Sequence, residues 1–95
     1  MIYSILLSDS VIDFLVSLDE KSRSICKNNL KKLQYPYPGR GPGDKERLVI
    51  RGKDRYRLHI GRTYTAFYLI DEDKKLVRVV ELLSIKAAHK KYGFY

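Results

Sequence analysis

The sequence predicts an α+β domain in which an N-terminal strand and a helical hairpin pack on an antiparallel β-meander. Three observations support this class. Apolar residues recur with helical spacing in the first third of the chain, they alternate with polar residues in the second half, and the two patterns occupy separate parts of the sequence. Because 95 residues are enough for one modest core, residues 1–95 are expected to form a single domain.

The N-terminal third predicts one strand and two helices. Residues 2–7 form a short apolar run of strand length, after which Ser8 or Asp9 can cap a helix. The apolar residues of that helix follow at i, i+3, i+4 and i+7, and Asp19 can cap a second helix from Glu20 to about Leu33. Helices separated by a single capping residue should form an antiparallel hairpin.

The rest of the chain predicts a meander followed by a helical tail. Residues 35–44 are rich in proline and glycine, which end the helix and exclude a central strand. Strands are expected at 48–50, 55–60, 64–70 and 76–83. Their connections are short enough to require antiparallel neighbours. Ser84 should cap a helix over 85–92 that ends at Gly93, and the sheet face opposite the hairpin is expected to be free.

Charge and cysteine content restrict the partners and the compartment. The chain has 19 basic and 11 acidic residues, a net charge of +8, and residues 48–95 carry eleven of the basic residues against five acidic ones. This excess favours polyanionic partners or an acidic protein. Cys26 is the single cysteine, which rules out an internal disulfide. With no leader pattern and no long apolar run, a cytoplasmic protein without a membrane role is expected.

The most informative segment is the strand that begins at Arg55. Arg55, Arg57 and His59 alternate with apolar residues and therefore project to one side of the predicted sheet. Adjacent cationic groups repel one another and are poor core material, so an anion is expected among them. Arg62 follows in the next turn and adds a further positive charge.

The sequence lacks the residue patterns that most catalytic chemistries require. His59 and His89 lie thirty residues apart without carboxylates at ligand spacing, so no metal site and no cofactor are predicted. No nucleophile has an adjacent base, and Glu81, in an apolar strand, is expected to pair with an arginine such as Arg57 or Arg62 rather than act as a base. Arg40, in a glycine-rich segment, is a minor candidate for a phosphate contact.

The cationic and aromatic residues that are left suit one metal-free reaction, the attack of an RNA 2′-hydroxyl on its own phosphate. This reaction needs positive charge around the phosphate and a group that exchanges a proton. Arginines supply the charge, and histidine, lysine or tyrosine can exchange the proton. A passive RNA-binding face would have the same composition.

The chain resembles the RelE/ParE superfamily of small bacterial and archaeal toxins over nearly its whole length. The resemblance depends on the order of elements and on three short motifs, which are Tyr56-Arg57-Leu58-His59-Ile60-Gly61, Tyr64-x-x-x-Tyr68, and the ending from Leu82 to Gly93. It implies a ribosome-dependent endoribonuclease that cuts messenger RNA without metal, and a cognate antitoxin protein that inhibits it. The resemblance also implies the RelE-like fold.

The resemblance assigns roles to five residues of this sequence. Arg57 and His59 match two basic strand residues, Lys86 a basic residue after the last strand, Tyr92 a tyrosine that stacks on a base or assists proton transfer, and His89 a general acid of some relatives. These five are the predicted catalytic set, and the predicted RNA-binding residues are Arg55, Arg62, Lys90 and Lys91. Thr65 departs from the pattern, because the family commonly has an arginine there as a phosphate ligand.

Three functions therefore stay open. The first is a RelE-like, translation-inhibiting endoribonuclease. A gyrase-directed ParE-like toxin shares the fold and is kept as an alternative by Thr65. The third is a basic module that binds RNA or an antitoxin without cleaving anything.

Overall fold

The computed structural model describes residues 2–39 and 43–93, and its elements follow the predicted order. Arg40 lies outside these described residues. The elements are β1 (Ser4–Leu7), α1 (Asp9–Ser17), α2 (Glu20–Leu30), a 3₁₀ turn η1 (Lys31–Gln34), β2 (Lys45–Ile50), β3 (Lys53–Ile60), β4 (Tyr64–Asp71), β5 (Leu76–Ser84) and α3 (Ile85–Tyr92). The α+β class is confirmed, and the second helix ends in a 3₁₀ turn rather than as a continuous α-helix.

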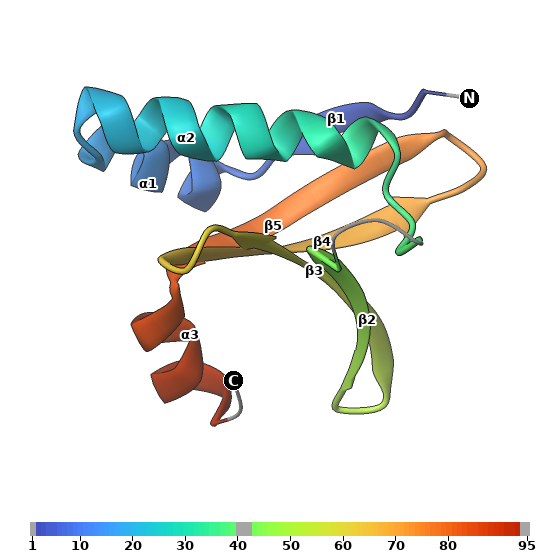
Figure 1. Cartoon of the computed structure of the whole chain (residues 1–95). Helices are drawn as coiled ribbons and strands as arrows, with labels where there is room; N and C mark the ends of the chain where they lie inside the picture. The colour runs from blue at the N-terminus through green and yellow to red at the C-terminus, as the bar shows by residue number, and fades with distance from the viewer. Residues whose placement is uncertain (1, 40–42, 94–95) are drawn as a thin grey trace.

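The strands form one sheet with the order β1-β5-β4-β3-β2 (Figure 1). Strands β2 to β5 are the predicted antiparallel meander. Strand β1 lies at one edge, parallel to β5, with a register from Ser4↔Leu76 to Leu7↔Val79. The helical hairpin provides the long crossover that a parallel pair requires.

Polar side chains fix the helical hairpin at its ends. Ser8 caps α1 by accepting a hydrogen bond from the Val11 amide at 3.4 Å, and Asp19 caps α2 by accepting one from the Ser22 amide at 3.1 Å. Both predicted caps are confirmed. Arg23 donates at 2.6–3.2 Å to three carbonyls near the end of α1, where the helix dipole favours a cation.

One hydrophobic core lies between this hairpin and the sheet. It combines apolar side chains from both helices with those of all three central strands, among them Val11, Leu15, Leu58, Tyr68 and Val79, each at most 4% exposed. Burying a side chain of this size contributes about 1.5–3 kcal/mol. The core therefore fixes which face of each strand points away from α1 and α2.

Helix α3 lies on the other side of the sheet from α1 and α2 (Figure 1). Ser84 caps it by accepting from the Ala87 amide at 3.1 Å, and Gly93 ends it with a left-handed φ of 73°, as predicted. Ala88 is fully buried. The expectation of a free sheet face is therefore wrong in part, because α3 folds back over it. None of the helices in the described ranges has the length and apolar character needed to span a membrane.

Candidate functional site

The candidate site lies on the α3 side of the sheet, where β3 places its alternate residues. Leu58 and Ile60 point into the core, so Arg55, Arg57 and His59 project to the opposite side. The register places Arg57 between Glu46 of β2 and Phe67 of β4. The predicted basic row therefore exists, and beside it lies a carboxylate, that of Glu46, which was not among the predicted site residues.

Glu46 holds the centre of this row. Its carboxylate forms an ion pair with Arg57, and its Oε1 lies 3.0 Å from Nε2 of His59. Arg57 is only 8% exposed, so the cation that the sequence placed on an open face is buried and paired. A buried arginine is stable where a carboxylate compensates its charge.

The surroundings of His59 favour its neutral form. Burial, followed by the charge of Arg57, lowers the pKa of His59 from its ordinary value of 6.5. Because a carboxylate only accepts hydrogen bonds, the contact with Glu46 requires the proton on Nε2. Nδ1 of the neutral ring then carries the lone pair, which suits a group that removes a proton.

A β-bulge brings a second carboxylate, Glu81, onto the same side of the sheet. Val79 pairs with Tyr68 and Glu81 pairs with Phe67, so Val80 is an extra residue in β5. Without it, Glu81 would follow the alternation of Val79 into the core. Instead, the Glu81 carboxylate accepts hydrogen bonds from the Tyr92 hydroxyl and, at 2.6 Å, from Lys91. Glu81 has a cationic partner, as expected, and the described one is Lys91 of α3 rather than an arginine.

Tyr92 closes the C-terminal end of α3 against the sheet. Its ring packs on Phe67 with the centroids 5.0 Å apart and the planes tilted by 58°. Burial, and then the hydrogen bond to Glu81, raise the pKa of Tyr92. The hydroxyl therefore stays protonated and donates to Glu81, and the ring supports α3.

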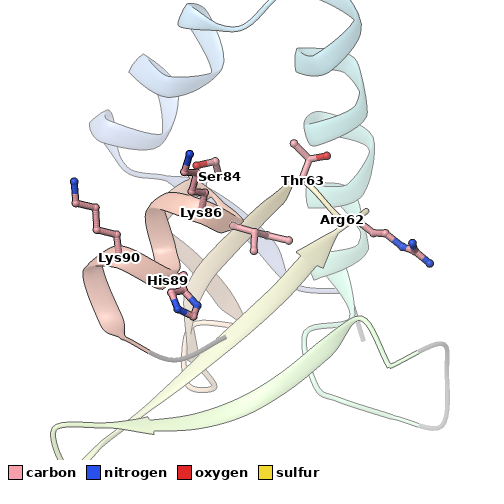
Figure 2. Close-up of a pocket in the computed structure, with 7 residues that line it drawn as sticks. Arg62, Thr63, Ser84, Lys86, His89 and Lys90 are labelled. Atoms are coloured by element: carbon pink, nitrogen blue, oxygen red, sulfur yellow. The ribbon is translucent and has the colours of Figure 1, made fainter.

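A pocket of about 740 Å³ lies at the N-terminal end of α3. It is lined by four of the predicted site residues, Arg62, Lys86, His89 and Lys90. Figure 2 shows Lys86 and Lys90 on one side of α3, His89 on the other, and Arg62 extending from the β3–β4 turn. The backbone amide of Ile85 donates to the carbonyl of that turn at 2.8 Å, which fixes the two elements relative to each other.

A second pocket, of about 340 Å³, lies between the β2–β3 hairpin and the C-terminal end of α3. Its lining includes the predicted residues Arg55, Lys91 and Tyr92, and also Arg51 and Lys53, which were not among the predicted site residues. Lys53 continues the alternation of Arg55 and Arg57, so extending the row by one step would have found it. We call this second pocket the hairpin pocket and the first one the N-terminal pocket.

The structure thus places the nine predicted residues in three groups on β3, the β3–β4 turn and α3. Four line the N-terminal pocket, two share Glu46, and three line the hairpin pocket. Their catalytic or binding roles stay predictions.

Thr65 occupies a position that would not accommodate an arginine without rearrangement. It pairs with His59 and Leu83 and lies on the side of β4 that faces α3, where it is 2% exposed. Its hydroxyl donates to the carbonyl of Leu58 at 3.4 Å. The chain therefore has a small, satisfied polar group where the resemblance implies a phosphate ligand.

The described part of the chain holds no group of three or more His, Cys, Asp or Glu side chains that could bind a metal ion. The two carboxylates of the site are instead committed to cationic or hydroxyl partners. The groups positioned at the site are thus arginine, lysine, imidazole and phenol.

This arrangement of sheet and helices is that of the RelE toxins. The chain aligns with the RelE–RelB complex of the archaeon Pyrococcus horikoshii at 24% identity and a TM-score of 0.70, covering 88% of this chain and 96% of that one. With RelBE2 of Mycobacterium tuberculosis it aligns at 14% identity and a TM-score of 0.72, covering 88% of this chain and 99% of that one. With a mutant of Escherichia coli RelE in the free state it aligns at 17% identity and a TM-score of 0.58, covering 94% of this chain and 90% of that one.

The similarity is structural rather than sequential. No protein-family model matches the chain, and a search of curated proteins gives no match. At identities below 25%, the comparisons establish the fold. The chain therefore has the RelE-like fold that its motifs predicted, and its function has to be argued from the site.

Proposed function

We propose that this protein is the toxin of a toxin–antitoxin pair and that it cleaves messenger RNA on the ribosome. The observation that carries the proposal is the neutral imidazole of His59, oriented by Glu46 beside Arg57 within a row of cations. Support also comes from the fold, which is that of RelE toxins.

The proposed reaction is transesterification within the RNA. The 2′-oxygen attacks the adjacent phosphorus, an O2′–P bond forms, and the P–O5′ bond breaks. His59 Nδ1 takes the proton of the 2′-hydroxyl, and His89 returns a proton to the leaving O5′. Lys86 stabilises the negative charge that develops on the phosphate. Arg57, buried in its ion pair with Glu46, holds that carboxylate beside His59. Tyr92 and Glu81 hold α3, and with it Lys86 and His89, against the sheet.

The partner proposed for the free toxin is an antitoxin protein. Three of the similar structures are complexes of a RelE-type toxin with its antitoxin. In this chain, Ile12 and Val16 of α1 and Ile25 of α2 are 44–69% exposed, which provides apolar surface for such a partner. A short, acidic, overlapping reading frame beside the gene would supply the candidate for co-purification.

The test is to map messenger RNA ends on purified ribosomes after adding the protein. Wild type should give cuts at fixed codon positions, and Lys86→Ala should reduce cleavage about 10²–10³-fold, the range for losing one group that stabilises the transition-state charge. Lys21→Ala, which removes an exposed lysine from α2, should cut like wild type. Intact messenger RNA under all conditions would refute the nuclease proposal.

Thr65 favours one alternative, a gyrase-directed toxin with the same fold. Its burial leaves the site without the expected arginine on β4. The same preparation would then inhibit supercoiling by purified gyrase while leaving ribosome-bound messenger RNA uncut.

A further inference from the structure

The β2–β3 hairpin carries a cluster of cations that the proposed reaction does not use. Arg51, Lys53 and Arg55 line the hairpin pocket together with Ile50, Lys91 and Tyr92. None of the three takes part in an ion pair among the described residues. Grouping like charges in this way is unfavourable unless an anion binds between them.

The acidic residue nearest in sequence to these cations is directed elsewhere. Asp54 lies between Lys53 and Arg55 in β3, so its side chain points to the other side of the sheet. There it accepts two hydrogen bonds from Arg47, at 2.9 and 3.0 Å. The hairpin is therefore positive on the side of the pocket and neutralised on the opposite side.

The pocket also offers a surface for a flat, apolar group. Ile50 and the ring of Tyr92 line it beside the cations, and its volume of about 340 Å³ lies within the range for a small-ligand site. Phosphate oxygens would contact Arg51, Lys53 and Arg55, and a base would lie against Ile50 or Tyr92. This combination of charge and apolar surface is that of a nucleotide site.

The pocket is separate from the reacting centre but continuous with it along β3. Lys53, Arg55 and Arg57 stand two residues apart on one face, so successive side chains are about 6.7 Å apart along the strand. Arg57 is ion-paired with Glu46, whereas Arg55 and Lys53 follow on the same face of β3 toward the β2–β3 turn.

We propose that the hairpin pocket is an RNA subsite, which binds a nucleotide that flanks the cleaved one in the same single strand. Arg51, Lys53 and Arg55 bind its phosphate, and the pocket wall at Ile50 receives its base. The inference extends the proposed function, because it assigns the path of the substrate beyond the cleaved bond.

The test variant is Arg51→Asn with Lys53→Gln. Asparagine is chosen because Arg51 has a positive φ of 53°, which asparagine tolerates better than most residues. A matched control exists in the β4–β5 turn, where Lys75 has a φ of 50°. Lys74→Gln with Lys75→Asn removes the same charge from a similar backbone, and Figure 1 shows this turn far from the β2–β3 turn.

Binding of a fluorescently labelled single-stranded hexaribonucleotide is measured by anisotropy across a salt series. Affinity falls with salt, so log K against log salt has a negative slope. For single strands, each lost phosphate contact makes this slope shallower by about 0.7, so the variant with Arg51→Asn and Lys53→Gln (the hairpin variant) should make it shallower by about 1.4. The control should keep the wild-type slope. Equal slopes in the two variants would overturn the subsite.

Two further outcomes separate this inference from the proposed function. RNA binding that depends on the hairpin, in a protein that never cuts messenger RNA on ribosomes, would support the subsite and refute the nuclease. Ribosomal cleavage with RNA binding unaffected by the hairpin variant would do the reverse. If the hairpin variant loses affinity for polyglutamate but not for RNA, the pocket belongs to a protein interface and the subsite is refuted.

Discussion

Glu46 determines the chemical state of His59. Its carboxylate fixes the proton on Nε2, while burial and Arg57 favour the neutral ring. In Glu46→Gln the carboxylate 3.0 Å from Nε2 is lost and Arg57 loses its counter-charge, so the pKa of His59 should fall further. The glutamine amide can also donate to Nε2, which a carboxylate cannot do. A larger share of the His59 rings should therefore carry the proton on Nδ1.

Nitrogen-15 NMR of the imidazole across a pH titration measures both the pKa and the tautomer. Glu81→Gln serves as the control, because Glu81 binds Tyr92 and Lys91. An unchanged His59 titration in Glu46→Gln would show that the pair has no influence in solution.

Thr65 provides a second test at the level of a single residue. Thr65→Arg would restore the residue that the resemblance implies, but the position is 2% exposed. Overpacking typically costs about 1–3 kcal/mol, and a buried unpaired charge adds to this. We therefore expect a lower free energy of unfolding in urea rather than higher activity. The same substitution at the exposed Thr63 should change stability by less than about 0.5 kcal/mol.

At the level of elements, α3 depends on the Glu81 clasp, which we define as the contacts of Glu81 with Lys91 and Tyr92. Hydrogen bonds to charged groups contribute about 1.5–3 kcal/mol, and Glu81→Gln weakens both. Amide hydrogen exchange in α3 should accelerate roughly tenfold, which corresponds to about 1.4 kcal/mol.

Glu72→Gln is the matched control for this experiment. Glu72 also accepts a hydrogen bond from a tyrosine hydroxyl, that of Tyr37, but in the β4–β5 turn. If α3 exchanges equally fast in both variants, the helix is held by its apolar contacts at Ala88 and Tyr92 alone.

The elements were predictable because their signals are local. Ser8, Asp19 and Ser84 cap the three helices as expected, and glycine ends the last one. The bulge at Val80 could not be predicted, since a single extra residue in an apolar strand leaves no pattern in the sequence. It decides where Glu81 points, and thus the partners of Tyr92.

At the level of the whole molecule, the sequence identified the cations but not their partners. Alternation placed Arg55, Arg57 and His59 on one face correctly. Glu46 was missed because its relation to Arg57 depends on the register of β2 against β3, across a turn. Likewise, the folding of α3 over the sheet is a tertiary contact that no local pattern encodes, and it is what turned an open face into three groups.

The parallel pairing of β1 with β5 has a consequence for folding during synthesis. Strand β1 is synthesised first among the strands, yet its hydrogen-bonding neighbour is made about seventy residues later. During translation, β1 and the apolar face of the helical hairpin lack the sheet on which they finally pack, since long-range pairings form late. Because α3 directly follows β5, the completed sheet and the assembled site should form almost together, once residues 76–92 have been synthesised. A nascent chain on its ribosome would then lack the assembled site until those residues have been made.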